Sequence, residues 1–120
     1  MSKGVSEQPL DCSVYDRDPM YQDWPAYLRK HSRTECELKE ELRSYLATHQ
    51  GCSNSAECTV VETSCPFGCG VAVSVRYAND VVTKYGELLQ RYRAMKVDCK
   101  YRCAPVGHAV CARGRCAAVR

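Results

Sequence analysis

The sequence predicts a small, disulfide-rich α+β domain with N-terminal helices and a small antiparallel sheet that an amphipathic helix covers. Ten of the 120 residues are cysteine, about 8%, which approaches the content of disulfide scaffolds. An apolar stripe with helical period runs through residues 77–95. Short β-branched segments separated by glycine and proline turns flank that stripe. The length fits one domain with a modest core that gains from cross-links.

Residues 1–22 are expected to form an extended arm. They are polar, contain Pro9 and Pro19, and show little periodicity. Cys12 is expected to attach this arm to the rest of the protein through a disulfide. The remaining residues, 23–120, are interpreted as a single cysteine-rich α+β domain.

The first part of that domain, residues 23–51, is predicted to be helical. Asp23 precedes a proline and resembles a helix cap, so we expect a short helix over 24–31. A capping box that begins at Thr34 then predicts a second, longer helix over 34–49.

The second part, residues 52–120, is predicted to have the element order β-β-α-β-β-β. Residues 59–63 and 70–75 are rich in β-branched side chains and are expected to pair as a hairpin. Residues 77–95 are the clearest helix of the chain and are expected to cover one side of the sheet.

The C-terminal residues are predicted to add three strands. Residues 97–103 alternate in polarity, which indicates a strand. Residues 109–111 and 116–119 are expected to form a second hairpin, with Gly114 in its turn.

All ten cysteines are expected to form disulfides, but composition alone leaves their pairing open. They are Cys12, Cys36, Cys52, Cys58, Cys65, Cys69, Cys99, Cys103, Cys111 and Cys116. A zinc site is the alternative, because two cysteine pairs can supply four thiolates. Its candidate ligands are Cys65, Cys69, Cys99 and Cys103. Against it, three residues separate the cysteines of each pair, whereas the usual zinc knuckle has two.

The spacing of these cysteines is similar to that of a known class of domain. The motifs are Cys52-x5-Cys58, Cys65-Pro-Phe-Gly-Cys69, Cys99-x3-Cys103 and Cys111-x4-Cys116. They resemble small cysteine-rich domains of exported bacterial proteins, often lipoproteins, of unknown function. The resemblance covers residues 52–120 and implies export and disulfides, with no activity.

Disulfides require an oxidising compartment, so we expect the protein to be secreted or periplasmic. The first residues contain no apolar segment typical of a signal peptide, which we interpret as the result of its removal. No apolar run is long enough to predict a membrane span. The formal net charge of +3 is mild and does not indicate binding to nucleic acid.

Two groups of side chains are candidate binding residues. Tyrosine and tryptophan favour interfaces because they combine apolar area with a polar tip; the first group is Tyr15, Tyr21, Trp24 and Tyr27. The second group is basic and partly aromatic, and consists of Lys100, Tyr101, Arg102, Arg113 and Arg115. The alternatives are that the aromatic residues pack the arm onto the body and that the basic residues protect sheet edges.

These observations predict an exported, non-catalytic binding or accessory module, of inhibitor or immunity type, without a cofactor. Its partner is expected to be another protein or an anionic surface. One alternative is an intracellular zinc protein that uses the four cysteine thiolates above. The other is a small secreted hydrolase whose site is assembled in space, since the sequence contains no G-x-S-x-G, H-E-x-x-H or phosphate-loop motif.

Overall fold

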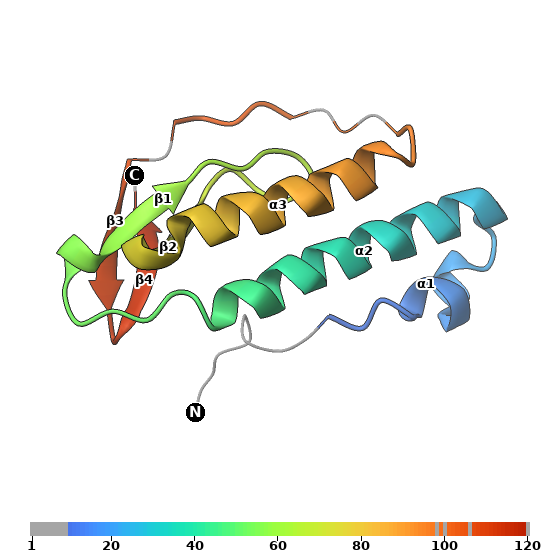
Figure 1. Ribbon diagram of the computed structural model, residues 1–120. Coiled ribbons are helices and arrows are strands. Elements are labelled where there is room, and N and C mark those ends of the chain that lie inside the picture. Colours follow the sequence, from blue (N-terminus) through green and yellow to red (C-terminus); the bar gives the residue numbers. More distant parts are fainter. Residues whose placement is uncertain (1–9, 98, 100, 106, 120) are drawn as a thin grey trace.

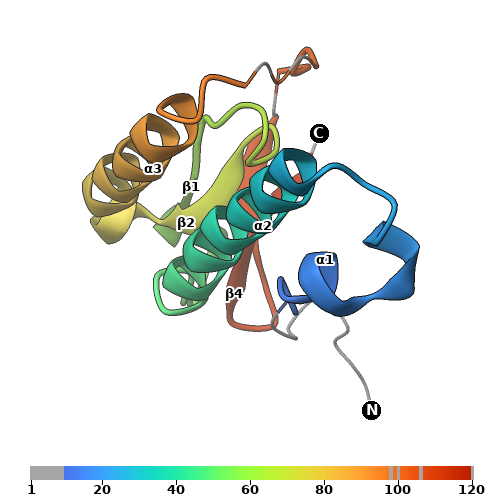
Figure 2. The same ribbon diagram turned by 90° about the vertical axis from the view of Figure 1, so that its right-hand side faces the viewer.

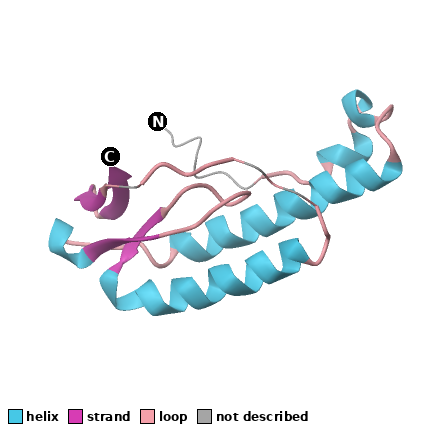
Figure 3. Ribbon diagram, turned by 90° about the horizontal axis from the view of Figure 1, so that it is seen from above, coloured by secondary structure: helices cyan, strands magenta, loops and turns pink. Residues whose placement is uncertain are grey.

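A computed structural model describes residues 10–97, 99, 101–105 and 107–119. Two long helices, α2 and α3, lie side by side, and the strands gather at one end of this pair (Figures 1 and 3). A short helix, α1, lies at the other end, on the side of α2 that faces away from α3 (Figure 2). The protein therefore has an elongated shape, with extents of 48 × 35 × 23 Å.

Helix α2 runs without interruption from Ala26 to Ala47, so the prediction of two separate helices is wrong. Serine and threonine cost only a few tenths of a kcal/mol inside a helix, far less than a proline. Arg33 also donates a hydrogen bond to Glu37 across the predicted boundary, an i,i+4 pair that supports a continuous helix. The capping-box pattern at Thr34 is therefore a mid-helix sequence.

Of the arm predicted over residues 1–22, residues 1–9 lie outside the described residues. Residues 10–22 are not extended as expected, because they contain helix α1 (Val14–Arg17) and the 3-10 helix η2 (Pro19–Tyr21). An aspartate side chain accepts a backbone hydrogen bond at the start of each of these two helices. Asp11 accepts a hydrogen bond from the backbone N–H of Ser13 at 3.2 Å, and Asp18 accepts one from Met20 at 2.9 Å. Side-chain acceptors of this kind favour turns and helix starts. Neither helix has a buried residue.

The first predicted hairpin is confirmed, with shorter strands. Strand β1 (Cys58–Val61) pairs antiparallel with β2 (Val71–Ser74). Thr63 shapes the connection: its Oγ1 donates to the Gly68 carbonyl at 2.9 Å and accepts from the Gly70 N–H at 2.8 Å. One buried hydroxyl thus satisfies two backbone groups of the turn.

Helix α3 (Ala78–Arg93) follows the 3-10 helix η4 (Val75–Tyr77) and confirms the predicted amphipathic helix. Its buried face contributes Val81, Leu88 and Tyr92 to the core. The rest of the core comes from α2 and from the first hairpin with its turn. Those residues are Leu38, Leu42, Leu46, Val61, Phe67 and Val73.

The second predicted hairpin is also confirmed, with strands β3 (His108–Ala112) and β4 (Arg115–Val119). Arg113 and Gly114 form its turn with φ angles of 56° and 77°, as expected for a two-residue connection that follows the twist of the strands. The two hairpins form two separate two-stranded sheets.

The strand predicted over 97–103 is absent at its described positions, 97, 99 and 101–103. This segment is fixed by side chains instead of by a strand ladder. Two disulfides attach it to the turn after β1, and the Tyr101 hydroxyl accepts a hydrogen bond from the Gly68 N–H at 2.9 Å.

All ten cysteines are paired, as expected. The five disulfides have Cα–Cα distances from 5.2 to 5.9 Å and are Cys12–Cys36, Cys52–Cys111, Cys58–Cys116, Cys65–Cys99 and Cys69–Cys103. Four of them connect the residues before α3 to the residues after it. The Cys58–Cys116 bond joins the two sheets.

Candidate binding surfaces

Three of the four predicted aromatic residues lie together at the end of the molecule that carries α1. The ring centroids of Tyr15 and Tyr21 are 4.8 Å apart, and those of Tyr21 and Trp24 are 4.7 Å apart. Asp18 and Pro19 turn the chain between α1 and η2, which brings these rings together. These three side chains, which are near one another in the sequence, therefore also pack together in the structure.

Two exposed side chains extend this cluster into a surface. Met20 is 71% exposed, and Tyr27, in the first turn of α2, is 75% exposed. We call the cluster of Tyr15, Tyr21 and Trp24, together with Met20 and Tyr27, the aromatic end. Its side chains are half-buried or exposed, and they lie apart from the hydrophobic core.

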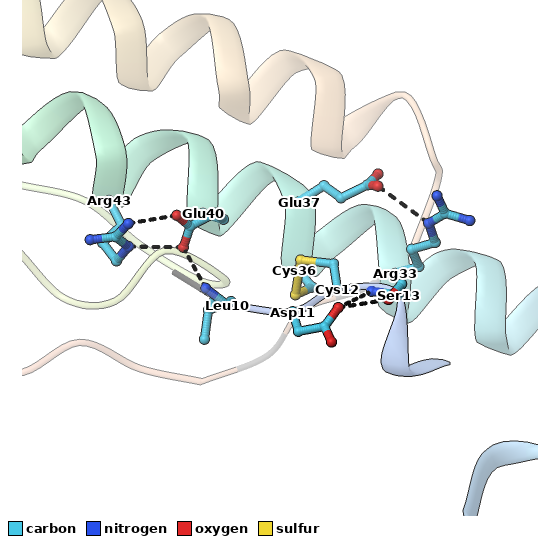
Figure 4. The surroundings of a disulfide bond; sticks show 9 residues. All are labelled: Leu10, Asp11, Cys12, Ser13, Arg33, Cys36, Glu37, Glu40 and Arg43. Carbon is cyan, nitrogen blue, oxygen red and sulfur yellow. Dashed lines mark hydrogen bonds and ion pairs between the residues drawn. A yellow bond between two sulfur atoms is a disulfide. The ribbon is translucent and has the colours of Figure 1, made fainter. Parts of the chain in front are cut away.

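One disulfide and several polar contacts attach the segment that carries the aromatic end to α2, and Figure 4 shows those made by residues 10–13. Cys12 is bonded to Cys36 of α2. The Leu10 N–H donates to Glu40 Oε1 at 3.0 Å, and Asp16 forms an ion pair with Arg33. The chain before α2 is therefore attached at three places along one helix.

The carboxylate of Glu40 is the polar centre of this attachment. Two nitrogens of Arg43 donate to its oxygens at 2.8 and 2.6 Å. The Arg43 hydrogen bonds, together with the Leu10 N–H and the Arg43 charge, lower the pKa of Glu40 to about 2 despite the opposing effect of desolvation. Glu40 therefore stays ionised throughout the range in which proteins usually function.

The predicted basic residues do not form one patch. Tyr101 and Arg102 lie beside the Cys65–Gly70 turn, whereas Arg113 lies in the turn between β3 and β4 and Arg115 is the first residue of β4. Lys100 lies outside the described residues. Tyr101 is engaged with Gly68, so its hydroxyl supports the fold.

A hollow of about 750 Å³, which no sequence motif predicted, lies at the end of the molecule that carries the second hairpin. Residues from three separated segments line it, among them Gly51, Ser53, Ala56, Val75, Arg76 and Gly114. We call it the hairpin hollow. Arg76 has no local motif around it, and only the folded chain brings it near the second hairpin.

The predicted alternative of a zinc site is not supported by the thiol chemistry. Cys65 is bonded to Cys99, and Cys69 is bonded to Cys103, so none of these four residues offers a thiolate. The sulfur atoms of Cys52, Cys58 and Cys116 lie within 4.8 Å of one another. They too belong to disulfides, and their proximity reflects two neighbouring cross-links.

The chain matches no protein-family model, no curated protein and no solved structure among those compared with it. The resemblance of residues 52–120 to exported cysteine-rich domains therefore stays a prediction. Within the described ranges, none of the helices has the length and apolar character needed to span a membrane.

Proposed function

We propose that this protein is an exported, non-catalytic module that binds another protein through its aromatic end. The observation that carries the proposal is the aromatic cluster with exposed Met20 and Tyr27 beside it. Aromatic residues and methionine are enriched in protein interfaces and contribute many of their strongest contacts. An inhibitor, immunity or cell-surface accessory role fits such a surface.

The five disulfides support both the compartment and the mode of binding. Disulfides persist in oxidising environments, which favours a secreted or periplasmic location. One of them, Cys12–Cys36, also attaches the segment that carries the aromatic end to α2 before a partner arrives. A preorganised surface loses less conformational entropy on binding.

The charges around the aromatic end are mixed, since Arg17, Arg29 and Lys30 lie in the same stretch of chain as the carboxylates, and this mixture favours a protein over an anionic surface as its partner. Asp18 and Asp23 lie in the same short segment as the exposed Met20. Carboxylates at this position repel phosphate or sulfate groups, whereas a protein can place a lysine or an arginine opposite them.

The experiment compares partner binding by the oxidised protein and by a double variant, M20A/Y27A. Both side chains are largely exposed, so we expect their removal to leave the fold intact. Secreted and surface proteins of the source organism are captured on immobilised wild-type protein, and each candidate is then purified and titrated. We expect a partner whose Kd increases at least ten-fold with the double variant.

The matched control is V82A, because Val82 is 52% exposed on α3, away from the aromatic end. We expect it to bind as the wild type does. A partner that binds M20A/Y27A with unchanged affinity excludes this surface as its interface. Absence of any purified partner with saturable binding contradicts the proposed function.

A further inference from the structure

The hairpin hollow has walls that are covalently fixed. Cys52 is bonded to Cys111 of β3, and its N–H donates to the Gly114 carbonyl at 3.0 Å. On another wall, the buried Ser74 hydroxyl donates to the Gly51 carbonyl at 2.6 Å. The hollow is therefore preformed, and its volume of about 750 Å³ lies in the range of ligand pockets.

Arg76 provides an available positive charge at this hollow. Its side chain is exposed, and its guanidinium lies over the Tyr77 ring, 4.9 Å from the centroid. Within the part of the chain that the structure describes, no carboxylate forms an ion pair with it. The ring orients the guanidinium while leaving its N–H donors available.

The other charged residue of the lining leaves Arg76 available for an anion. Glu57 also lines the hollow, but its carboxylate accepts a hydrogen bond from the Ser53 N–H and is therefore engaged within the wall. Arg113 and Arg115 are not among the lining residues, and Arg115 Nε donates to Gln50 Oε1 at 3.0 Å. The positive charge that the lining offers to a ligand is thus that of Arg76, and it favours a negative group.

The apolar part of the lining places a second requirement on the ligand, besides a negative charge. Val75 is 51% exposed although it is a large aliphatic residue, and Ala56 is exposed beside it in the 3-10 helix η3 (Ser55–Glu57). Both line the hollow. A ligand that covers them needs an aliphatic portion next to its negative group.

We propose that the hairpin hollow binds a carboxylate attached to a small aliphatic group, with Arg76 as its anchor. Guanidinium and carboxylate groups match in a planar, bidentate geometry. Two sources supply this chemistry: the C-terminal end of a peptide and a free aliphatic acid. The volume accommodates either, and the experiment distinguishes them.

This site does not depend on the proposed function. The hollow is lined by residues 51–57, which follow the C-terminal end of α2, whereas the aromatic end lies at the N-terminal end of that helix. The 22 residues of that helix separate them by roughly 33 Å. Loss of binding at one end therefore leaves the other to be tested by itself.

The test is a titration followed by the backbone amide signals of Ser53, Val75 and Gly114 in 15N-labelled oxidised protein. The probes are acetyl-Ala-Val with a free carboxylate, the same peptide as its amide, and pentanoate. We expect saturable shifts with the free peptide and binding at least ten-fold weaker with the amide, because a charge-assisted hydrogen bond is lost. Equal binding by pentanoate assigns the site to aliphatic acids in general, and much weaker binding assigns it to peptide ends.

Two variants test the anchor and the hollow separately. R76Q is expected to weaken binding at least ten-fold, whereas R102Q, an exposed arginine near the start of strand β2, is expected to change it less than two-fold. A56F places a ring in the hollow from an exposed position and is expected to abolish binding. Absence of saturable shifts with either carboxylate probe, equal binding by the amide, or unchanged binding by R76Q overturns the proposal.

Discussion

Cys12 and Cys36, with Cα atoms 5.5 Å apart, form the one disulfide that joins the N-terminal segment to helix α2. The other four disulfides all lie within residues 52–116. The aromatic end is therefore cross-linked separately from the rest of the described chain, which we call the body.

The double variant C12S/C36S is expected to loosen the aromatic end and leave the body folded. Closing a loop of this length restricts the unfolded chain by about 3 kcal/mol, and the segment has no buried residue to compensate. Trp24 is the only tryptophan, so its fluorescence reports on this end alone. We expect a red-shifted emission with little change in far-ultraviolet circular dichroism. An unchanged Trp24 emission would show that the polar contacts suffice.

The attachment through Glu40 is expected to weaken in acid. A folded-state pKa of about 2 lies below the ordinary value of 4.5. The stabilisation is therefore fully present above pH 4.5 and is lost as the pH falls toward 2. Protonation should release the Leu10 N–H, which hydrogen exchange at that amide measures. In E40Q, we expect Leu10 to exchange faster at neutral pH and to lose this pH dependence; identical profiles would contradict the assignment.

An ion-pair network between α2 and α3 gives a third prediction. Lys84 donates to Glu41 at 2.7 Å, and Arg91 approaches the same carboxylate at 3.1 Å. The Lys84 hydrogen bond lowers the pKa of Glu41, and Glu41 in turn raises the pKa of Lys84. The Glu41–Lys84 pair thus stabilises the folded state between about pH 4.5 and 10.5. Outside that window its stabilisation declines, in acid because Glu41 becomes protonated and in alkali because Lys84 loses its proton.

The variant E41Q is expected to lower the free energy of unfolding by about 0.5–1 kcal/mol at pH 7, since partly exposed pairs contribute little each. Urea denaturation measures this loss, and high salt should reduce it. E62Q, at an exposed position outside both helices, is the control and should be neutral. A loss that persists unchanged in 1 M salt would argue against an ionic origin.

The turn between β1 and β2 is expected to depend on one hydroxyl. Replacing Thr63 with valine keeps the shape but leaves the Gly68 carbonyl and the Gly70 N–H without their partner. We expect T63V to cost about 1–3 kcal/mol in thermal or urea unfolding. T83V, the same change at an exposed position of α3, should stay within about 0.5 kcal/mol. Equal stability of the two variants would mean that water replaces the hydroxyl.

Sequence patterns correctly predicted those elements that are specified by residues close together in the chain. The apolar stripe of α3 and the turn at Gly114 depend on neighbours in sequence, and both were confirmed. The break predicted at Thr34 was wrong because a capping box marks a helix start only where the preceding residues do not continue the helix. Helix propensity alone does not distinguish a capping box at a helix start from the same residues in the middle of a helix.

The arrangement of the candidate sites was less accessible to sequence reasoning. Tyr15, Tyr21 and Trp24 are near neighbours in the chain, so their cluster was foreseeable. Arg76 shares the hairpin hollow with Gly114 because disulfides and backbone hydrogen bonds hold the second hairpin against the residues after α2. Cysteine pairing is a property of the folded chain, and ten cysteines do not specify it.

The four disulfides that connect the residues on either side of α3 also determine how the protein responds to a protease. A single cut anywhere between Cys69 and Cys99 separates the chain into two pieces that four covalent bonds still hold together. Such a nicked molecule keeps its mass, apart from one added water, until a reductant is present. Helix α3 lies wholly within this stretch, so a cut in it leaves the two halves covalently linked as a two-chain molecule.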